Sequence, residues 1–223
     1  MAFPRCTSWQ SVLYKHKHMV NVISYSNHFS SPLGSQSRHY CAIRNSNDMA
    51  QSTRQEALED LSTLWCTQII QDPQWKALSS RQNSSNQLFS DTLWTQKTIR
   101  AHQSYYKKPP AGRTIGGELR VLLSLGSGLD GYPGMCHGGL LTLLFDDAIH
   151  ELAAQEIPDV SITVTLNTTF RQPVRTPSVV LCRVWMEKEP QGRKAWVQAS
   201  IENGNGGVYA SADSFILRMK GKL

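Results

Sequence analysis

One helix that is apolar on nearly every side is the feature that most constrains the fold of this chain. The segment 134–154 reads GMCHGGLLTLLFDDAIHELAA, a tight glycine-rich turn that leads into a helix predicted over 137–155. A helix with apolar residues all round must be covered by other elements. The same helix carries two adjacent acids, Asp146 and Asp147, and a carboxylate on an apolar helix is costly unless it is paired or functional.

Strand patterns on both sides of this helix supply the cover. Apolar and polar residues alternate after Val160, so that Ile162 and Leu166 are predicted on one face of a strand. Thr163 and Asn167 are predicted on the opposite face. The short links between strands favour antiparallel pairing. The sequence therefore predicts an α+β fold with a curved antiparallel sheet wrapped around one long helix. The predicted strands are 118–125, 160–170, 179–187, 194–202 and 208–218.

The segment before the first of these strands is predicted to contain one further helix, over 48–71. Apolar residues recur there at three- and four-residue spacing, and Asp72-Pro73 ends the pattern. The stripe consists of Leu58, Leu61, Leu64, Trp65 and Ile69. A polar loop follows the helix, and 88–106 is predicted as a strand or a strand with a turn.

Charge is distributed unevenly along the chain. Of the 23 Lys and Arg residues, five lie in 1–47, where there is no acid, which leaves 18 basic against 17 acidic side chains in the remainder. The remainder is thus nearly neutral, and no nucleic-acid partner is predicted. No apolar run approaches the roughly 20 residues of a membrane span. The five cysteines form no CxxC pair, which is typical of a reducing compartment.

The acid-free segment 1–47 is rich in Ser and His, which is typical of an organelle transit peptide, and we predict a mitochondrial location. An untargeted tail on a cytoplasmic protein is one alternative. The C-terminal Gly-Lys-Leu, one residue away from a peroxisomal Ser-Lys-Leu signal, suggests another.

The start of the central helix has the chemistry of an oxyanion site. Gly138 and Gly139 allow a ligand to approach bare backbone. The first N–H groups of a helix have no internal acceptor and lie at the positive end of its dipole. Burial would raise the basicity of Asp146, as suits a general base or nucleophile. Asp147 lies about 100° further round the axis, so one acid is predicted to be catalytic and the other exposed or structural. Alternatively, both face a polar rim.

Three quoted segments carry a resemblance to a known family. They are GYPGMCHGG at 131–139, the HGGxxxxxxD spacing from His137 to Asp146, and LNTTFRQPV at 166–174. In this order and spacing they resemble the hotdog-fold acyl-CoA thioesterases of the phenylacetate-pathway type and their mitochondrial relatives. The resemblance covers about 118–219 and implies a hotdog domain, which we place at 88–223. A helix and loop at 48–87 and a targeting-like disordered tail at 1–47 are expected before it.

The resemblance also implies an activity and a site. The activity is hydrolysis of an acyl-CoA, or of another acyl thioester, to a free acid and a thiol, without a metal or cofactor. Asp146 would activate water or attack the thioester, and the N–H of Gly138 or Gly139 would polarise the carbonyl. His137 would orient the carbonyl or water, and Thr163 would help to place the water. Homodimers or homotetramers with shared active sites are expected, in which the helix of one subunit meets the HGG loop of another.

The residues that would bind substrate are less sharply defined. Asn167 belongs to the matching strand segment, and CoA is strongly anionic, so basic side chains are expected at the tunnel mouth. The basic candidates are Arg171, Arg175, Lys188 and Arg193. The second acid, Asp147, departs from the family pattern and leaves open which aspartate reacts.

Other motifs in the chain support different functions less well. The GxGxxG pattern at 126–131 is followed by a Tyr-Pro-Gly turn where a dinucleotide-binding fold needs a helix. Cys136 and His137 are adjacent, whereas catalytic pairs usually come from distant positions. His150 beside Glu151 is interpreted as a solvated or core histidine rather than a metal ligand. A hotdog protein that binds acyl-CoA without hydrolysing it, or a dehydratase-like one, is the alternative function.

Overall fold

The computed structural model describes residues 59–79, 86–113, 116–157 and 159–219, all within the unit Ile43–Leu223. The predicted transit segment, the first part of the predicted 48–71 helix and the C-terminal Gly-Lys-Leu lie outside the described residues.

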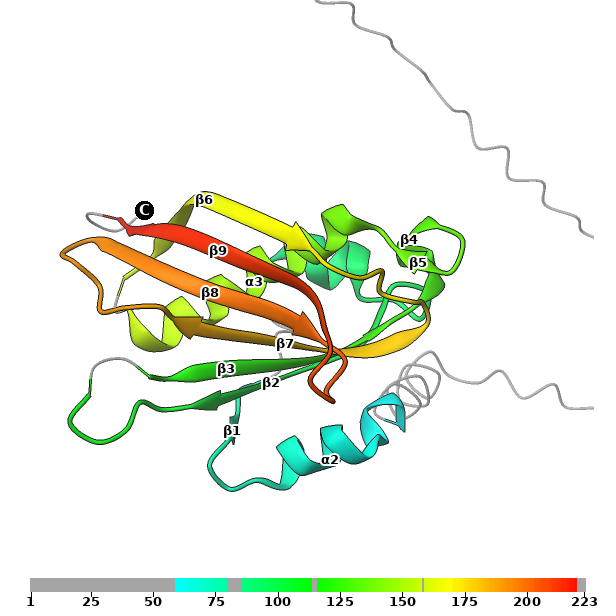
Figure 1. The fold of residues 1–223 in the computed structure, drawn as a ribbon, viewed down its shortest axis with the longest axis horizontal. Helices are drawn as coiled ribbons and strands as arrows, with labels where there is room; N and C mark the ends of the chain where they lie inside the picture. Colours follow the sequence, from blue (N-terminus) through cyan, green and yellow to red (C-terminus); the bar gives the residue numbers. More distant parts are fainter. Residues whose placement is uncertain (1–58, 80–85, 114–115, 158, 220–223) are drawn as a thin grey trace, which may run out of the picture. The chain divides into compact units, whose positions relative to one another are not determined.

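A seven-stranded antiparallel sheet forms the framework (Figure 1), in the order β1-β2-β3-β7-β8-β9-β6. The strands are β1 (Lys76–Ala77), β2 (Ile99–Lys107), β3 (Glu118–Leu125), β6 (Ser161–Phe170), β7 (Ser178–Met186), β8 (Lys194–Glu202) and β9 (Val208–Arg218). A separate hairpin joins β4 (Asp130–Tyr132) to β5 (Met135–Cys136). The predicted strands agree with the structure to within one residue at each end, and their antiparallel pairing is confirmed.

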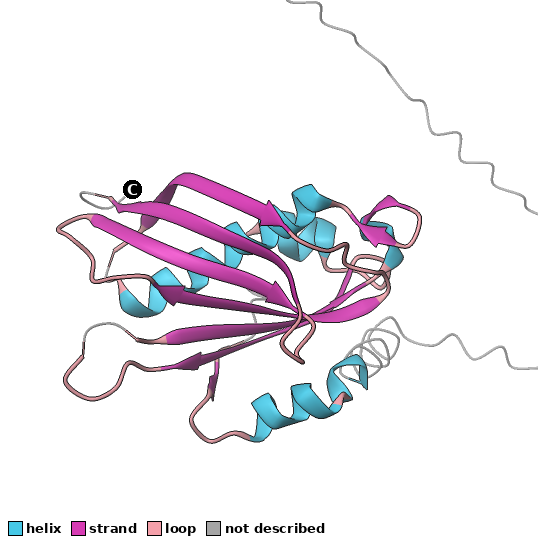
Figure 2. Cartoon of the chain, in the orientation of Figure 1, coloured by secondary structure: helices cyan, strands magenta, loops and turns pink. Residues whose placement is uncertain are grey.

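The long helix α3 (Gly138–Glu156) packs on one face of this sheet (Figure 2). Its buried side chains include Leu144, Phe145 and Ile149, which form one core cluster with residues of β3, β7, β8 and β9. Each fully buried side chain of this size contributes about 1.5–3 kcal/mol through removal of apolar surface from water. The predicted α+β fold, a curved antiparallel sheet around one central helix, is confirmed.

The opposite face of the sheet is covered by the segment before it. A 3₁₀ turn, η1 (Asp60–Ser62), and the helix α2 (Leu64–Gln71) form a second cluster on β2, β3 and β7. The continuous helix predicted here is wrong within the described residues, because Thr63 is extended. Serine and threonine favour helix starts over helix interiors, and the interruption changes the phase of the helix. Leu64, predicted on the apolar stripe, is therefore 77% exposed.

The region 88–106 also differs from the prediction in its first part. Residues Leu88–Leu93 form a π-helical turn, η3, and only the second part is a strand, β2. Among the residues of η3 only Phe89 is buried, and it packs into the main core. This single buried residue anchors the turn, whereas a strand would bury alternate residues.

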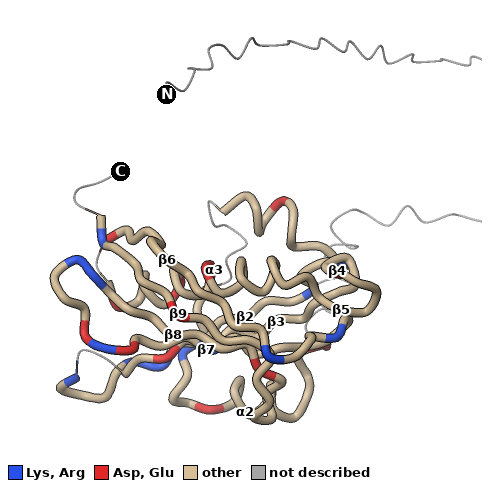
Figure 3. The backbone as a smooth tube through the Cα atoms, turned by 45° about the horizontal axis from the view of Figure 1, so that its top comes forward, with Lys and Arg blue, Asp and Glu red and all other residues tan. Residues whose placement is uncertain are grey.

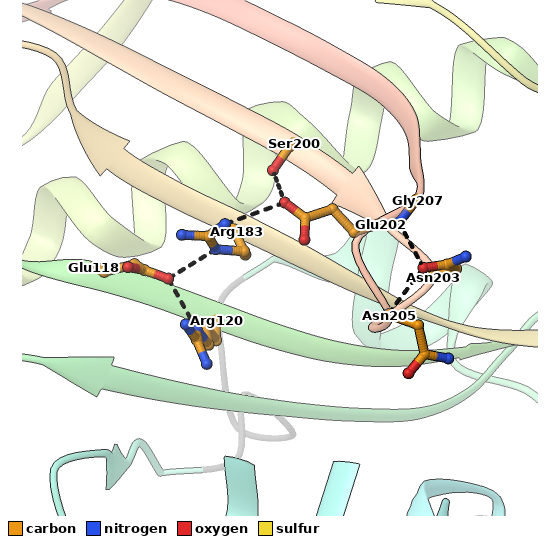
Figure 4. Close-up of polar contacts among 8 residues, drawn as sticks. All are labelled: Glu118, Arg120, Arg183, Ser200, Glu202, Asn203, Asn205 and Gly207. Carbon is orange, nitrogen blue, oxygen red and sulfur yellow. Dashed lines mark hydrogen bonds and ion pairs between the residues drawn. The ribbon is translucent and has the colours of Figure 1, made fainter. Parts of the chain in front are cut away.

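A ladder of charged side chains crosses the outer face of the sheet (Figure 4). Arg120 and Arg183 each donate to Glu118 Oε1 at 2.9 Å, and Arg183 reaches Glu202 Oε1 at 3.4 Å. Burial alone would raise the pKa of the Glu118 carboxyl, but the hydrogen bonds and charges of the two guanidinium groups lower it below its usual range. The ladder links β3, β7 and β8, while charged residues elsewhere lie scattered along the backbone (Figure 3).

Candidate active site at the central helix

The loop that starts α3 is fixed by its own hydrogen bonds. Gly134 has a φ of 72°, which favours glycine, and its N–H donates to Asp130 Oδ2 at 2.8 Å. His137 is the N-cap of α3, and its Nδ1 accepts from the Gly139 N–H at 2.9 Å. A Cβ at Gly131 would lie 3.0 Å from the His137 ring, so glycine there makes room for the imidazole.

This capping distinguishes the two glycines of the motif. The Gly139 N–H is already bonded to His137, whereas the Gly138 N–H has no acceptor among the described residues. The Gly138 N–H is thus available to a ligand at the positive end of the α3 dipole. From the sequence, either glycine could supply the N–H that polarises the carbonyl.

A cavity of about 310 Å³ opens beside Gly138. Its walls are mainly apolar, and the Phe170 ring lies 3.2 Å from the position that a Gly138 Cβ would take. Arg171, one of the basic candidates for substrate binding, lines the same cavity. The lining residues are Cys136, Gly138, Leu141, Phe170, Arg171, Gln172, Pro173 and Val174.

Cys136 is not suited to act as a nucleophile here. Burial, assisted by the charge of Asp130, raises the pKa of its thiol to about 11. The thiol is therefore protonated near neutral pH, while nucleophilic attack needs the thiolate.

The two acids of α3 point to different neighbours. Asp146 is half-buried and accepts a hydrogen bond of 2.6 Å from Thr163 Oγ1 on β6. Asp147 accepts a bond of 3.2 Å from Asn86 Nδ2, which precedes η3. Thr163 therefore lies beside Asp146, on the face of β6 that the sequence predicted to be polar.

A β-bulge changes that face further along β6. The pairing of β6 with β9 shifts between Thr163 and Thr165. Beyond the bulge, Thr168 bonds Thr142 of α3 at 3.2 Å, while Asn167 is exposed. Leu166 packs against the core, although the alternation placed it on the same face as Ile162. The simple alternation is thus wrong beyond Val164, because an extra residue in one strand reverses the facing of those after it.

The remaining basic candidates are not among the residues that line the cavity. Arg175 is exposed and pairs with Met135 through an isolated bridge. Lys188 lies over the Trp196 ring at 4.0 Å, and Arg193 donates to the Arg218 carbonyl at 2.8 Å. Lys188 and Arg193 belong to the β7–β8 turn, at the opposite end of the sheet from β4 and β5 (Figure 1).

His150 is a member of the site that the sequence interpretation missed. Its Nε2 lies 2.9 Å from Thr163 Oγ1 and 4.0 Å from Asp146 Oδ1. The i,i+4 spacing from Asp146 on one helix was the available signal. No group of His, Cys, Asp and Glu side chains within the described ranges could hold a metal ion. The helices that the structure describes are too short or too polar to cross a membrane.

Comparisons with known proteins agree with this architecture. Residues 133–210 match the model of a family described as the Thioesterase superfamily. The matched stretch contains the HGG motif, Asp146 and the 166–174 segment, so the match agrees with the resemblance that these segments carry.

One curated relative extends the comparison to a particular enzyme. Over 75 residues the chain is 33% identical to Acyl-coenzyme A thioesterase THEM4 of Mus musculus. These 75 residues are 34% of this chain and 31% of that protein. The chain thus matches about a third of the length of this relative.

Solved structures with a similar arrangement include two bacterial proteins. The PaaI protein of E. coli, from the phenylacetic acid degradation operon, has a TM-score of 0.43 and 16% identity, covering 47% of this chain and 75% of that chain. The BH2602 protein of Bacillus halodurans, solved with CoA, has a TM-score of 0.41 and 19% identity, covering 45% of this chain and 66% of that chain.

Proposed function

We propose that this protein hydrolyses an acyl-CoA thioester to a free acid and CoA. The observation that carries this proposal is that one helix bears both an available N–H, at Gly138, and a carboxylate, Asp146, that Thr163 holds in place. These groups supply a polarised carbonyl and a general base. A thioester needs little more, because resonance donation from sulfur is weak.

In the proposed reaction the thioester oxygen accepts the Gly138 N–H. Asp146 takes a proton from water as the water oxygen bonds to the carbonyl carbon. The C–S bond then breaks, its electron pair stays on the CoA sulfur, and the thiolate takes up a proton. One backbone donor of this kind stabilises the transition state by about 2.7–4 kcal/mol. The cavity beside Gly138 is where the acyl thioester would lie, with Arg171 at its wall.

The two halves of this site are too far apart to serve one carbonyl in one chain. Gly138 and Asp146 are eight residues apart, which is about 12 Å along the helix axis and about 80° around it. A carbonyl and a water bridge at most about 10 Å even when fully extended. We therefore propose that Gly138 of one copy acts with Asp146 of a second copy, in a homodimer or a larger assembly of dimers.

The surface of β6 fits such a second copy. β6 is an edge strand of the sheet, and several of its large apolar side chains are exposed. Exposed apolar residues that cluster on one edge of a sheet usually mark a site of interaction with another molecule. The exposed apolar residues of β6 are Ile162 at 42%, Val164 at 49% and Phe170 at 54% exposure, and Val160, just before the strand, is 56% exposed.

The test is release of CoA thiol from acyl-CoAs of different chain length by the full chain. Asp146→Asn should lower kcat by about 100- to 10,000-fold, the usual contribution of a general base. Asp147→Asn is the matched control and should stay close to wild type, because its amide oxygen can still accept from Asn86. Loss of turnover in Asp147→Asn alone would contradict the assignment. Binding of acyl-CoA without thiol release would favour the binding or dehydratase-like alternative.

A further inference from the structure

A chain of four polar side chains links α3 to β6 around Asp146. Thr163 Oγ1 lies 2.6 Å from Asp146 Oδ1, His150 Nε2 lies 2.9 Å from Thr163 Oγ1, and Ser161 Oγ lies 3.3 Å from His150 Nδ1. His150 is one helical turn after Asp146, so both side chains leave α3 on the side of β6. The 4.0 Å between His150 Nε2 and Asp146 Oδ1 is too long for a direct hydrogen bond.

The direction of each hydrogen bond follows from the number of protons available. An ionised carboxylate can only accept, so the single hydroxyl proton of Thr163 is donated to Asp146. Thr163 must then accept from His150, whose Nε2 therefore carries a proton. In a neutral imidazole the other nitrogen is an acceptor, and Ser161 donates to it. The neutral Nε2–H tautomer of His150 satisfies all three hydrogen bonds, and each donor then points along the series towards Asp146.

We infer that His150 is a positioning residue for the general base. It holds the Thr163 hydroxyl on Oδ1 of Asp146, which leaves Oδ2 to take the proton of the attacking water. This role rests on the proposed thioester hydrolysis. The water O–H bond breaks towards Oδ2, the water oxygen bonds to the carbonyl carbon, and the C–S pair leaves with sulfur. His150 neither gains nor loses a proton in this step.

Two substitutions at one position separate this role from simple packing. His150→Leu keeps the volume but removes the donor, and it should lower kcat by about 10- to 100-fold with KM unchanged, as a misplaced catalytic group does. His150→Gln places an amide N–H near the Nε2 position and should restore most of the loss. His102→Leu, at a half-buried histidine that lies 5.4 Å from the Trp94 ring, is the control and should leave kcat unchanged.

The link through Thr163 is tested by a double-mutant cycle. Thr163→Val should lower kcat to a similar extent as His150→Leu, and the double variant should be no worse than either single one, because both break the same chain. Unchanged kcat in His150→Leu, equal impairment of the Leu and Gln variants, or fully additive losses would each overturn the inference.

A second measurement does not depend on turnover. Imidazole ¹⁵N NMR of the full chain near neutral pH, assigned by the signals lost in His150→Gln, should show the neutral Nε2–H tautomer. An Nδ1–H tautomer, which has no proton on Nε2 to donate to Thr163, would overturn the inference even in a protein that hydrolyses thioesters. Wild-type protein without thioesterase activity but with the Nε2–H tautomer would refute only the proposed function.

Discussion

At the scale of single residues, neighbours in the sequence have different hydrogen-bond partners. Asp146 and Asp147 are adjacent, yet Thr163 of β6 bonds the first and Asn86 bonds the second. Gly138 and Gly139 are also adjacent, yet only the second is occupied by the His137 cap. The 100° step of a helix sends the two carboxylates to different partners, and the N-cap side chain accepts from the second N–H of the helix rather than the first.

The far end of α3 offers a residue-scale prediction. The Tyr106 hydroxyl donates to Glu156 Oε1 at 3.3 Å, and burial, then the Glu156 charge and hydrogen bond, raise the pKa of Tyr106 to about 12. A tyrosine ordinarily has a pKa of about 10. The protonated form is thus favoured by folding, so its stabilisation is complete below pH 10 and is lost as the pH rises through 12. Absorbance titration should show a tyrosine near 12 that Tyr106→Phe removes, and identical titrations of the two proteins would contradict this.

At the scale of elements, α2 covers the outer face of the sheet through a few side chains. Ile69 is 7% exposed in the cluster with Leu122 and Leu181, while its neighbour Ile70 is 43% exposed. The same truncation at these two positions should therefore have very different effects. Ile69→Ala should lower the free energy of unfolding by about 2–5 kcal/mol, including the cavity that it leaves. Ile70→Ala should change it little, and urea unfolding of both variants measures the difference. Equal losses would mean that α2 does not pack on the sheet in this way.

Most of the fold could be predicted because its elements follow strong local patterns. The strands β3, β8 and β9 were predicted with their observed bounds, since apolar segments bounded by turns define them. The bulge between Thr163 and Thr165 could not be predicted from the alternation of residues, and the break at Thr63 reflects tertiary contacts as well as the local preference of threonine. Asp60, for example, is held by Arg100 at 3.0 Å and by Ser124 at 2.7 Å, from two different strands.

The site was predictable in its motif but not in its hydrogen bonds. His137, Gly138 and Asp146 belong to segments that resemble a known family, Thr163 lies three residues before one of them, and these residue types suggest the chemistry. The i,i+4 spacing brings His150 near Asp146, but its contact with Thr163 depends on how β6 lies against α3. Arg193 shows the converse, since its guanidinium group is bonded to the Arg218 carbonyl rather than placed at the cavity.

At the scale of the whole molecule, the separation of Gly138 and Asp146 is the decisive fact. In the proposed reaction, a helix with the oxyanion donor at its start and the base about 12 Å further on would need a second copy to bring both to one thioester. Two exposed apolar residues of the edge strand β6, Ile162 and Val164, flank Thr163, which bonds Asp146. The assembly would therefore complete the site and cover that edge at once, as in an isologous interface.

Complementation between two inactive chains tests this claim most directly. Asp146→Asn lacks the base, and Gly138→Val lacks the open donor, because its side chain would meet the Phe170 ring. Co-expressed with different tags and purified through both, the mixed dimers have one site with both lesions and one intact site. We predict that they regain about half of the wild-type thioesterase activity per dimer, while each variant alone has almost none. Mixed dimers as inactive as either parent would contradict a site shared between chains.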